Sequence, residues 1–459
     1  MINRIVCLSL MFLGFSIYVG AAEPSVSITA EQVKAMVEKA KPLIEEMAGR
    51  KYKNEVKWNV VKRDAVRDVL IQEISPQLNK LLSGMGDDLI ARQAEMLAQA
   101  TSQSLLGKYS FLKKELYIVP DNIKTVAEIL GIKDADIEEF TFLVTAHEMV
   151  HVLDDQYYDL AEKLENMDNV EGSQAFNALV EGHAVYITNK IADRLKISET
   201  ARNMAVRSAA GIQNEADRQQ QQLFQSIYVK GSEFVGAIIA QKGNAAIDDA
   251  FARPPVSTRQ IMNPEEYLNG SSVVNIDYKN LLRKVTAELP LEGMRSQSVD
   301  LGSMTLHALV VSQGIPEKEA VKIADGCLDG VLFSAARQAI KPSTITVVVI
   351  NFKNGESAAE FDEMGQKVEK SEIAQFTARL NTSYKLIKEE TFKQDGFDFI
   401  RYRRVEKKVD DEVTGEISAV GTAGNIYVEM GFRNMPELTE NDVLKFMRLI
   451  SAELAQKPE

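Results

Sequence analysis

The chain is poor in residue types that often carry protein chemistry. Its 459 residues include only 4 histidines, 2 cysteines and 1 tryptophan. No basic cluster, glycine-rich phosphate loop or serine-nucleophile elbow stands out in the sequence. These absences argue against a nucleotide-binding loop and against a serine-hydrolase site.

Charge and length narrow the class of protein further. The formal net charge is −13, charged residues make up 26% of the chain and hydrophobic residues 45%. Such proportions are typical of folded globular domains. The acidic balance excludes nucleic acid and anionic membrane surfaces as expected partners. A chain of this length predicts two or three domains.

The first 22 residues have the pattern of a signal peptide. Arg4 precedes an apolar run from Ile5 to Val19, and small residues follow up to Ala22. The run is short for a membrane span, so we expect cleavage after Ala22 or Ala21 and export to the periplasm or the medium. An uncleaved N-terminal anchor is the alternative. After cleavage no stable membrane insertion is expected, and Cys327, the remaining cysteine, is expected to be a small core residue without a disulfide partner.

Two of the four histidines stand in the pentapeptide His147-Glu148-Met149-Val150-His151. On a helix, positions i and i+4 lie on one face, one turn apart. Two imidazoles so placed can bind one Zn²⁺, and the carboxylate after the first can hold a water beside it. The alternative interpretation is a pair of surface histidines on an amphipathic helix.

A zinc site needs a third protein ligand. Residues 136–160 read as one helix with acidic residues in its first turn, but a third histidine six residues after His151 is absent, because that position is Tyr157. The helix expected over 170–196 offers Glu181 within an apolar pattern, beside small residues that allow close helix packing. The rival ligand His183 lies about 200° further around that helix. A rim glutamate in solvent is the alternative for Glu181.

At this point the chain resembles a group of secreted bacterial zinc metallopeptidases of the gluzincin type, in the thermolysin-like superfamily. Their pattern is HExxHALQDQ, ALxEGDA, YxxGxxFV and PPxSTEQILHPEKY. The matching runs are HEMVHVLDDQYYDL (147–160), ALVEGHAVY (178–186), YVKGSEFV (228–235) and RPPVSTRQIMNPEEY (253–267).

The resemblance implies Zn²⁺ bound by His147, His151 and Glu181, and a peptide or protein substrate. In the mechanism that this site predicts, Glu148 is the general base of peptide-bond hydrolysis. Tyr228 and Tyr267 are candidates for stabilising the oxyanion of the transition state, because the resemblance surrounds both. An ordinary structural role is the alternative for each tyrosine.

Several positions depart from the family pattern. His183 stands in place of aspartate, Asn263 in place of histidine and Cys327 in place of tryptophan. The aspartate usual four residues after the glutamate ligand is replaced by Val185, so no partner for the first histidine is identified. An inactive peptidase-fold binding protein of the cell envelope is therefore the alternative function. A structural metal site closed by His183 or Asp155 is a third possibility.

The predicted fold class is α+β. Residues 23–285 are expected to form a mainly helical, gluzincin-like domain with a small sheet, and residues 286–459 a C-terminal α+β domain. In gluzincins a sheet edge pairs with the substrate backbone, and the resemblance makes the stretch 109–119 or 56–61 a candidate for that edge, with an ordinary sheet strand as the alternative. The expected helices are 28–47, 64–98 with breaks near Pro76 and Gly84–Gly86, 136–160, 170–196, 200–249, 304–312, 317–339, 356–370 and 438–455. The expected C-terminal strands are 344–352, 384–390, 397–405 and further strands within 417–432. The sequence does not predict an oligomeric state.

Overall fold

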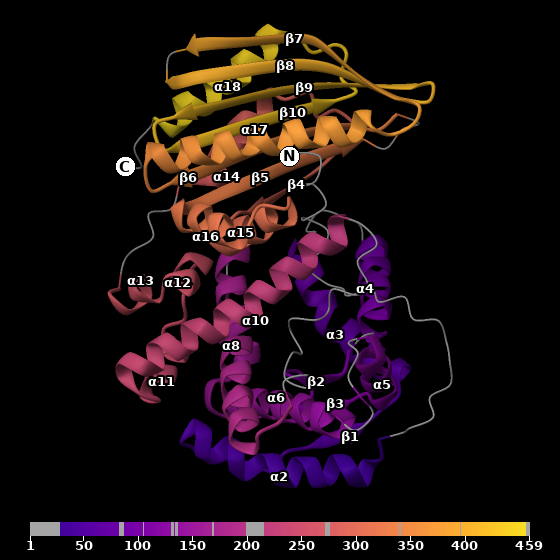
Figure 1. Ribbon diagram of the computed structural model, residues 1–459, viewed down its shortest axis with the longest axis vertical. Coiled ribbons are helices and arrows are strands. Elements are labelled where there is room, and N and C mark those ends of the chain that lie inside the picture. Colours follow the sequence, from indigo (N-terminus) through magenta and orange to yellow (C-terminus); the bar gives the residue numbers. More distant parts are fainter. Residues whose placement is uncertain are drawn as a thin grey trace.

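The computed structural model describes residues 28–455, apart from 82–86, 104, 130–132, 134–135, 168, 199–214, 271–275, 338, 340 and 395. The expected signal peptide and the first part of the helical stretch expected from Thr200 lie outside the described residues. The fold is α+β, with a mainly helical N-terminal half below a large C-terminal sheet (Figure 1). None of the described helices is long and apolar enough to cross a membrane.

The N-terminal half is built around one buried helix. Helix α6 (Ile137–Tyr158) has buried side chains on nearly every side, and α8 (Val170–Leu195), α2 (Ala30–Ala48) and a small sheet pack around it. The remaining elements of this half are β1 (Trp58–Val60), α3 (Arg63–Leu81), α4 (Asp87–Ser102), β2 (Gly107–Ser110), β3 (Glu115–Ile118), α5 (Pro120–Ile129), α7 (Leu160–Glu165), α10 (Glu215–Lys242), α11 (Ala245–Ala252), α12 (Thr258–Met262) and α13 (Pro264–Leu268).

Local sequence signals fix the first helix. Thr29 caps α2, accepting a hydrogen bond from the backbone of Gln32, while the Gln32 side chain accepts one from the Thr29 backbone. This reciprocal pair satisfies two amides that would otherwise lack partners. Gly49 ends the helix at φ 71°, a conformation that glycine adopts without steric cost. The expected helix over 28–47 is thereby confirmed.

The small sheet has the order β1-β3-β2, so β2 is an edge strand. Its partner β3 is antiparallel, with Tyr109 opposite Leu116. The carbonyls of Leu106 and Ser110 accept hydrogen bonds from the β3 side. Because hydrogen-bonding direction alternates along an antiparallel strand, the amides of Gly107 and Tyr109 face the open edge.

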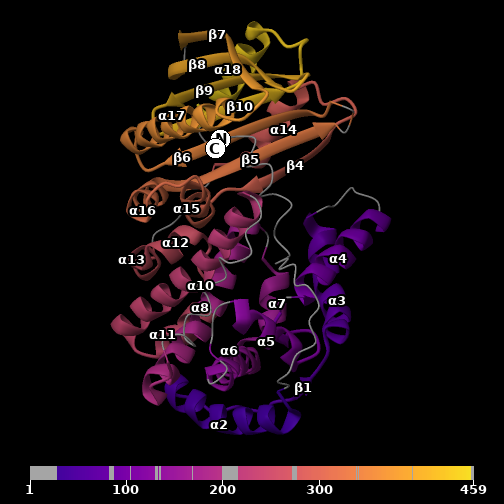
Figure 2. The same cartoon turned by 45° about the vertical axis from the view of Figure 1, so that its right-hand side comes forward.

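Helices α3 and α4 form an arm that stands apart from the body (Figure 2). The arm has its own apolar cluster, which includes Leu70, Ile74 and Ala94. Buried Asn122 links the start of α3 to the end of α4. It accepts a hydrogen bond from Arg63 and donates to the carbonyls of Ser102 and Leu105. Pro76 does not break α3, contrary to the sequence expectation.

The C-terminal sheet has seven antiparallel strands in the order β4-β5-β6-β10-β9-β8-β7. Alternate residues of strand β6 point to opposite faces, so Val347 and Val349 contribute to one core and Val348 and Ile350 to another. Helices α14 (Tyr278–Glu288) and α18 (Glu440–Leu454) cover the first face, and α15 (Ser303–Ser312), α16 (Glu317–Gly326) and α17 (Gly355–Thr377) the second. The strands are β4 (Arg295–Asp300), β5 (Cys327–Arg337), β6 (Ser343–Phe352), β7 (Thr382–Gln394), β8 (Phe397–Val409), β9 (Glu412–Ala423) and β10 (Ile426–Arg433).

Two features of this half differ from the sequence expectation. The helix expected over 317–339 ends at Gly326, and the chain continues as strand β5. Strand β5 is buried on both faces between β4 and β6, so it lacks the alternation that marks a half-exposed strand. Helix α14 begins before residue 286 but packs into the core of the C-terminal sheet, which favours an earlier domain boundary than the one expected.

Candidate metal centre

Helices α6 and α8 bring three predicted ligands together. The Nε2 atom of His147 lies 3.0 Å from Oε2 of Glu181, and Nε2 of His151 lies 3.4 Å from the same oxygen. All three ligand atoms lie within 4.8 Å of one another. Donors about 2.1 Å from a tetrahedral ion are separated from each other by roughly 3.4 Å. The spacing of this group therefore fits a metal ion.

The electrostatics of the group also favour a cation. Although burial disfavours a charged imidazole, the carboxylates of Glu181, Glu148 and Asp154 raise the pKa of His151 to about 9. Burial acts to raise the pKa of Glu181, but His151 and His147 outweigh it and hold that pKa below its usual range. A pocket that stabilises an extra proton in this way also stabilises a metal cation in the same place.

The ligand set is enclosed but not sealed. The side chains of His147 and His151 are 9% and 5% exposed, and that of Glu181 is 18% exposed. His183 and Asp155 are engaged elsewhere, because His183 pairs with Asp154 and Asp155 binds the hydroxyl of Tyr109. Within the described ranges the group consists of His147, His151 and Glu181, and a three-residue set of this kind would leave a fourth position for water or substrate, as a catalytic site requires.

Glu148 lies between the ligands and the open edge of the small sheet. Its Oε2 accepts a 2.7 Å hydrogen bond from the outward-facing amide of Tyr109 in β2. A Cβ atom placed on Gly107 would lie 3.1 Å from Cγ of Glu148 and 3.1 Å from a methyl group of Val144. Glycine at this position therefore leaves the space that the Glu148 side chain occupies.

Tyr228 reaches the site from a third helix, α10. Its ring stacks on His147 with centroids 5.9 Å apart and an interplanar angle of 20°. Burial, together with the charges of Glu181 and Glu148, raises the pKa of the phenol well above its usual value, and the hydroxyl hydrogen-bonds to Glu181. The phenol therefore remains protonated and able to donate a hydrogen bond beside the metal ligands.

The placement of Tyr228 follows from two glycines. Gly182, next to Glu181 on α8, meets Gly231 on α10, and a Cβ on Gly182 would lie only 2.2 Å from the carbonyl carbon of Gly231. The two helices thus cross with their backbones in contact. Tyr228 lies one turn before this crossing, so the close approach brings its ring to His147.

The other tyrosine candidate is not part of this arrangement. The hydroxyl of Tyr267 donates a 3.0 Å hydrogen bond to the carbonyl of Arg253, and its ring packs edge-on against Phe234. These contacts give Tyr267 a structural role between α10 and α13. They favour the structural alternative for Tyr267, and its role in the transition state stays a prediction.

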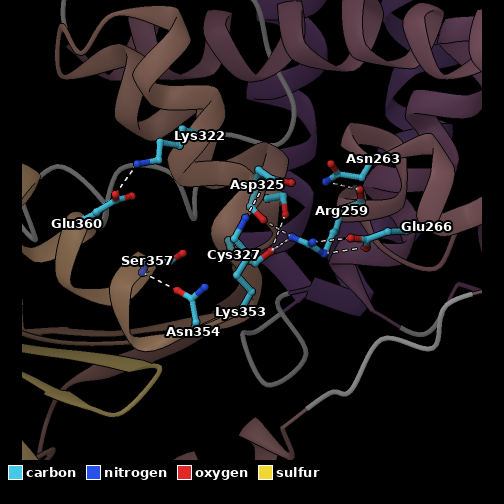
Figure 3. A network of polar contacts seen from close by, with 11 residues as sticks. Arg259, Asn263, Glu266, Lys322, Asp325, Cys327, Lys353, Asn354, Ser357 and Glu360 are labelled. Atoms are coloured by element: carbon cyan, nitrogen blue, oxygen red, sulfur yellow. Dashed lines mark hydrogen bonds and ion pairs between the residues drawn. The ribbon is translucent and has the colours of Figure 1, made fainter.

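Asn263 also lies away from the metal ligands. It stands at the junction of α12 and α13, where its amide donates to the carbonyl of Arg259 (Figure 3). Arg259 is buried, pairs with Glu266 and donates to the carbonyls of Asp325 and Cys327 at the start of the C-terminal sheet. The departure at position 263 thus affects the contact between the two halves.

Sequence reasoning missed three contributors to the site. Gly107 and Gly231 matter through the space they leave, and neither has a chemical group that a motif search would single out. Asp154 contributes a carboxylate that lies 2.8 Å from Nδ1 of His183. Its position one turn after His151 on the same face was the available signal.

Comparisons with known proteins give little further information. No protein-family model matches the chain, and no curated protein matches it. One solved structure, described as a "putative hydrolase with a novel fold" from Chloroflexus aurantiacus, is 22% identical with a TM-score of 0.43. The match covers 58% of this chain and 96% of that one. A likeness this distant carries neither fold nor activity over to this chain.

Proposed function

We propose that the protein is a zinc-dependent peptidase of the gluzincin type, in which His147, His151 and Glu181 hold the ion and Glu148 is the general base. The convergence of these three ligands, with Glu148 beside them, is the observation that carries the proposal. Zinc bound there would supply Lewis acidity, polarising a scissile carbonyl and lowering the pKa of water.

Glu148 and Tyr228 carry out the proton transfer and the stabilisation of negative charge. Glu148 takes the proton of the attacking water and passes it to the leaving amine. The Tyr228 hydroxyl, whose ring stacks on His147, donates a hydrogen bond toward the negative charge that develops on the carbonyl oxygen. The half-enclosed setting strengthens both interactions, because charges interact more strongly where water is scarce.

The open edge of β2 supports a peptide as the substrate. The amide of Gly107 faces outward beside Glu148, whose Oε2 already accepts a hydrogen bond from the neighbouring outward amide of Tyr109. An extended peptide can add to such an edge through main-chain hydrogen bonds, which recognise any sequence. Of the two stretches considered from the sequence, 109–119 contributes to this edge together with Gly107, while β1 forms the opposite edge of the sheet.

The inactive binding protein gains no support from the described residues. That alternative depended on Asn263 and on a missing partner for a histidine ligand. Asn263 contacts Arg259, away from the metal ligands, and Glu148 is present with its carboxylate toward the site. Export through a cleaved signal peptide remains part of the proposal, and N-terminal sequencing of the exported protein would check it.

Substitution of Glu148 by glutamine tests the function. Glu148→Gln removes the base without touching a ligand, so we expect one bound zinc per chain and a loss of casein hydrolysis of at least about 100-fold. Glu162→Gln, the same change at an exposed position of α7, should leave both unchanged. Full turnover by Glu148→Gln, or absence of zinc from the unmodified protein, would contradict the proposal.

A further inference from the structure

The proposed ligand His151 has one ring nitrogen whose hydrogen-bonding capacity is unused among the described residues. Its Nε2 faces Glu181, while its Nδ1 is buried and has no hydrogen-bond partner among the described residues. When an imidazole binds a metal through one nitrogen, the other carries a proton and normally donates it to a carboxylate or a carbonyl. An acceptor for Nδ1 is therefore needed once the site is loaded.

Asp154 has a hydrogen-bond acceptor that is likewise unused among the described residues. Its side chain is 1% exposed to solvent, and one of its oxygens, Oδ1, is buried without a hydrogen-bond partner in the described part of the chain. Asp154 follows His151 by three residues on α6, so the two side chains share one face of the helix, although the structure as described has no hydrogen bond between Oδ1 of Asp154 and Nδ1 of His151. A buried acceptor and a buried donor that both lack partners are each costly alone and stabilising together.

The second oxygen of Asp154 is held from the neighbouring helix. Oδ2 lies 2.8 Å from Nδ1 of His183, whose side chain is 3% exposed. His183 follows Glu181 by two residues on α8, so the pair joins the two helices that supply the ligands. Removing one partner of such a buried pair leaves the other group uncompensated and destabilises this arrangement.

We infer that Asp154 is a positioning residue for the metal centre: its free oxygen accepts the Nδ1 proton of His151, and His183 holds the carboxylate in place for that role. The inference rests on the metal-binding function proposed above. It assigns an orienting residue to the second histidine, His151, whereas the partner that the family pattern lacks is that of the first, His147.

Metal affinity provides the test, measured on the full chain by competition for Zn²⁺ with a chromophoric chelator. Asp154→Ala should weaken zinc binding by about 10- to 100-fold, and Asp154→Asn, which retains an acceptor oxygen, should weaken it less. His183→Gln, whose amide can still donate to Asp154, should stay closer to the unmodified protein than His183→Ala. The absorption spectrum of the Co²⁺-substituted protein should change in Asp154→Ala, since it reports ligand geometry.

Asp155→Asn is the matched control. Asp155 is the adjacent buried carboxylate of α6, but it binds Tyr109, Lys114 and the amide of Leu160. This change should lower the stability of the metal-free protein and leave zinc affinity and the Co²⁺ spectrum unchanged. Should Asp154→Ala fail to fold, Asp154→Asn and His183→Ala give the same comparison.

The outcomes separate this inference from the proposed function. If the unmodified protein binds zinc and the Asp154 and His183 variants bind it equally tightly, the pair is a structural ion pair and the inference is wrong, while the peptidase proposal stands. Equal losses of affinity in Asp154→Asn and Asp155→Asn would also overturn it. If the unmodified protein binds no zinc, both proposals fall.

Discussion

Gly182 of α8 and Gly231 of α10 meet backbone to backbone beside the metal ligands. A Cβ on Gly231 would lie 2.1 Å from the carbonyl oxygen of Ala178, and one on Gly182 would fall within 2.6 Å of three backbone atoms of Gly231. No rotamer change relieves such contacts, because backbone atoms cannot move aside independently. The crossing sets the distance between the helix that carries Glu181 and the helix that carries Tyr228.

We expect Gly231→Ala to lower the free energy of unfolding by about 1–3 kcal/mol or more, because the helices must separate to admit the methyl group. Gly236→Ala is the control on the same helix, since its methyl would meet the Tyr186 ring at an ordinary 3.5 Å. That variant should change stability by less than about 1 kcal/mol, with helix propensity in its favour. Urea unfolding of both variants gives the comparison, and equal stabilities would contradict the crossing as described.

Substitution of Gly107 should affect catalysis without affecting zinc. In Gly107→Ala the new methyl would lie 3.1 Å from Glu148, so the general base must shift. A misplaced catalytic group can cost about 100-fold in rate, and we expect kcat to fall by about 10- to 100-fold with zinc content unchanged. Gly415→Ala in β9, where the methyl would meet nothing within 4 Å, should behave like the unmodified protein. An unchanged kcat in Gly107→Ala would show that Glu148 has more room than the structure indicates.

Removal of the Tyr228 hydroxyl tests its role in turnover. Tyr228→Phe keeps the ring on His147 but deletes the hydroxyl, which faces Glu181. Loss of one such donor typically lowers kcat by about 10²–10³-fold, and we expect a loss in this range with at most a small change in zinc affinity. Tyr267→Phe is the matched control, because that hydroxyl binds the Arg253 carbonyl. Equal activity of the two variants would remove Tyr228 from the mechanism.

Glu171, at the contact between the two halves, should make the free energy of unfolding depend on pH. Burial raises the pKa of Glu171 to about 7, against hydrogen bonds from Thr258 and with support from the charges of Asp300 and Asp329. Because the folded pKa lies above the ordinary value of 4.5, the contribution of Glu171 is fully present below pH 4.5 and is lost as pH rises through 7. At pH 8 the ionisation of buried Glu171 lowers the free energy of unfolding by up to about 3 kcal/mol.

Glu171→Gln resembles the protonated acid and should therefore be more stable than the unmodified protein at pH 8. At pH 5, where Glu171 is protonated in the folded protein, the difference should largely disappear. Urea unfolding at the two pH values measures this, with Glu162→Gln as the exposed control. A Glu171→Gln variant that loses stability equally at both pH values would mean that the carboxyl is not charged at pH 8.

The ligand set could be predicted because its chemistry is local in the sequence. His147 and His151 share a helix face through their spacing alone, and few residue types complete such a pair. The same reasoning could not rank Tyr228 above Tyr267, because their difference depends on where α10 crosses α8. That crossing depends on Gly231, which meets a glycine 49 positions earlier in the chain.

Non-local pairing also explains the main errors in the fold. Residues 327–337 form a strand because β4 and β6 lie on either side of them, and their apolar run alone fits a buried helix equally well. The pairing of His183, one of the departures from the family pattern, with Asp154 on α6 is a further long-range contact that the sequence did not predict.

The guanidinium of Arg259 has a consequence for anyone who wishes to shorten this protein. Two of its acceptors are main-chain oxygens of Asp325 and Cys327. A fragment that stops before the large sheet would therefore leave the buried guanidinium without these two acceptors, with Glu266 as its remaining partner. Such a fragment would expose an interior surface rather than yield a minimal enzyme. The C-terminal half is better regarded as part of the scaffold than as a detachable accessory.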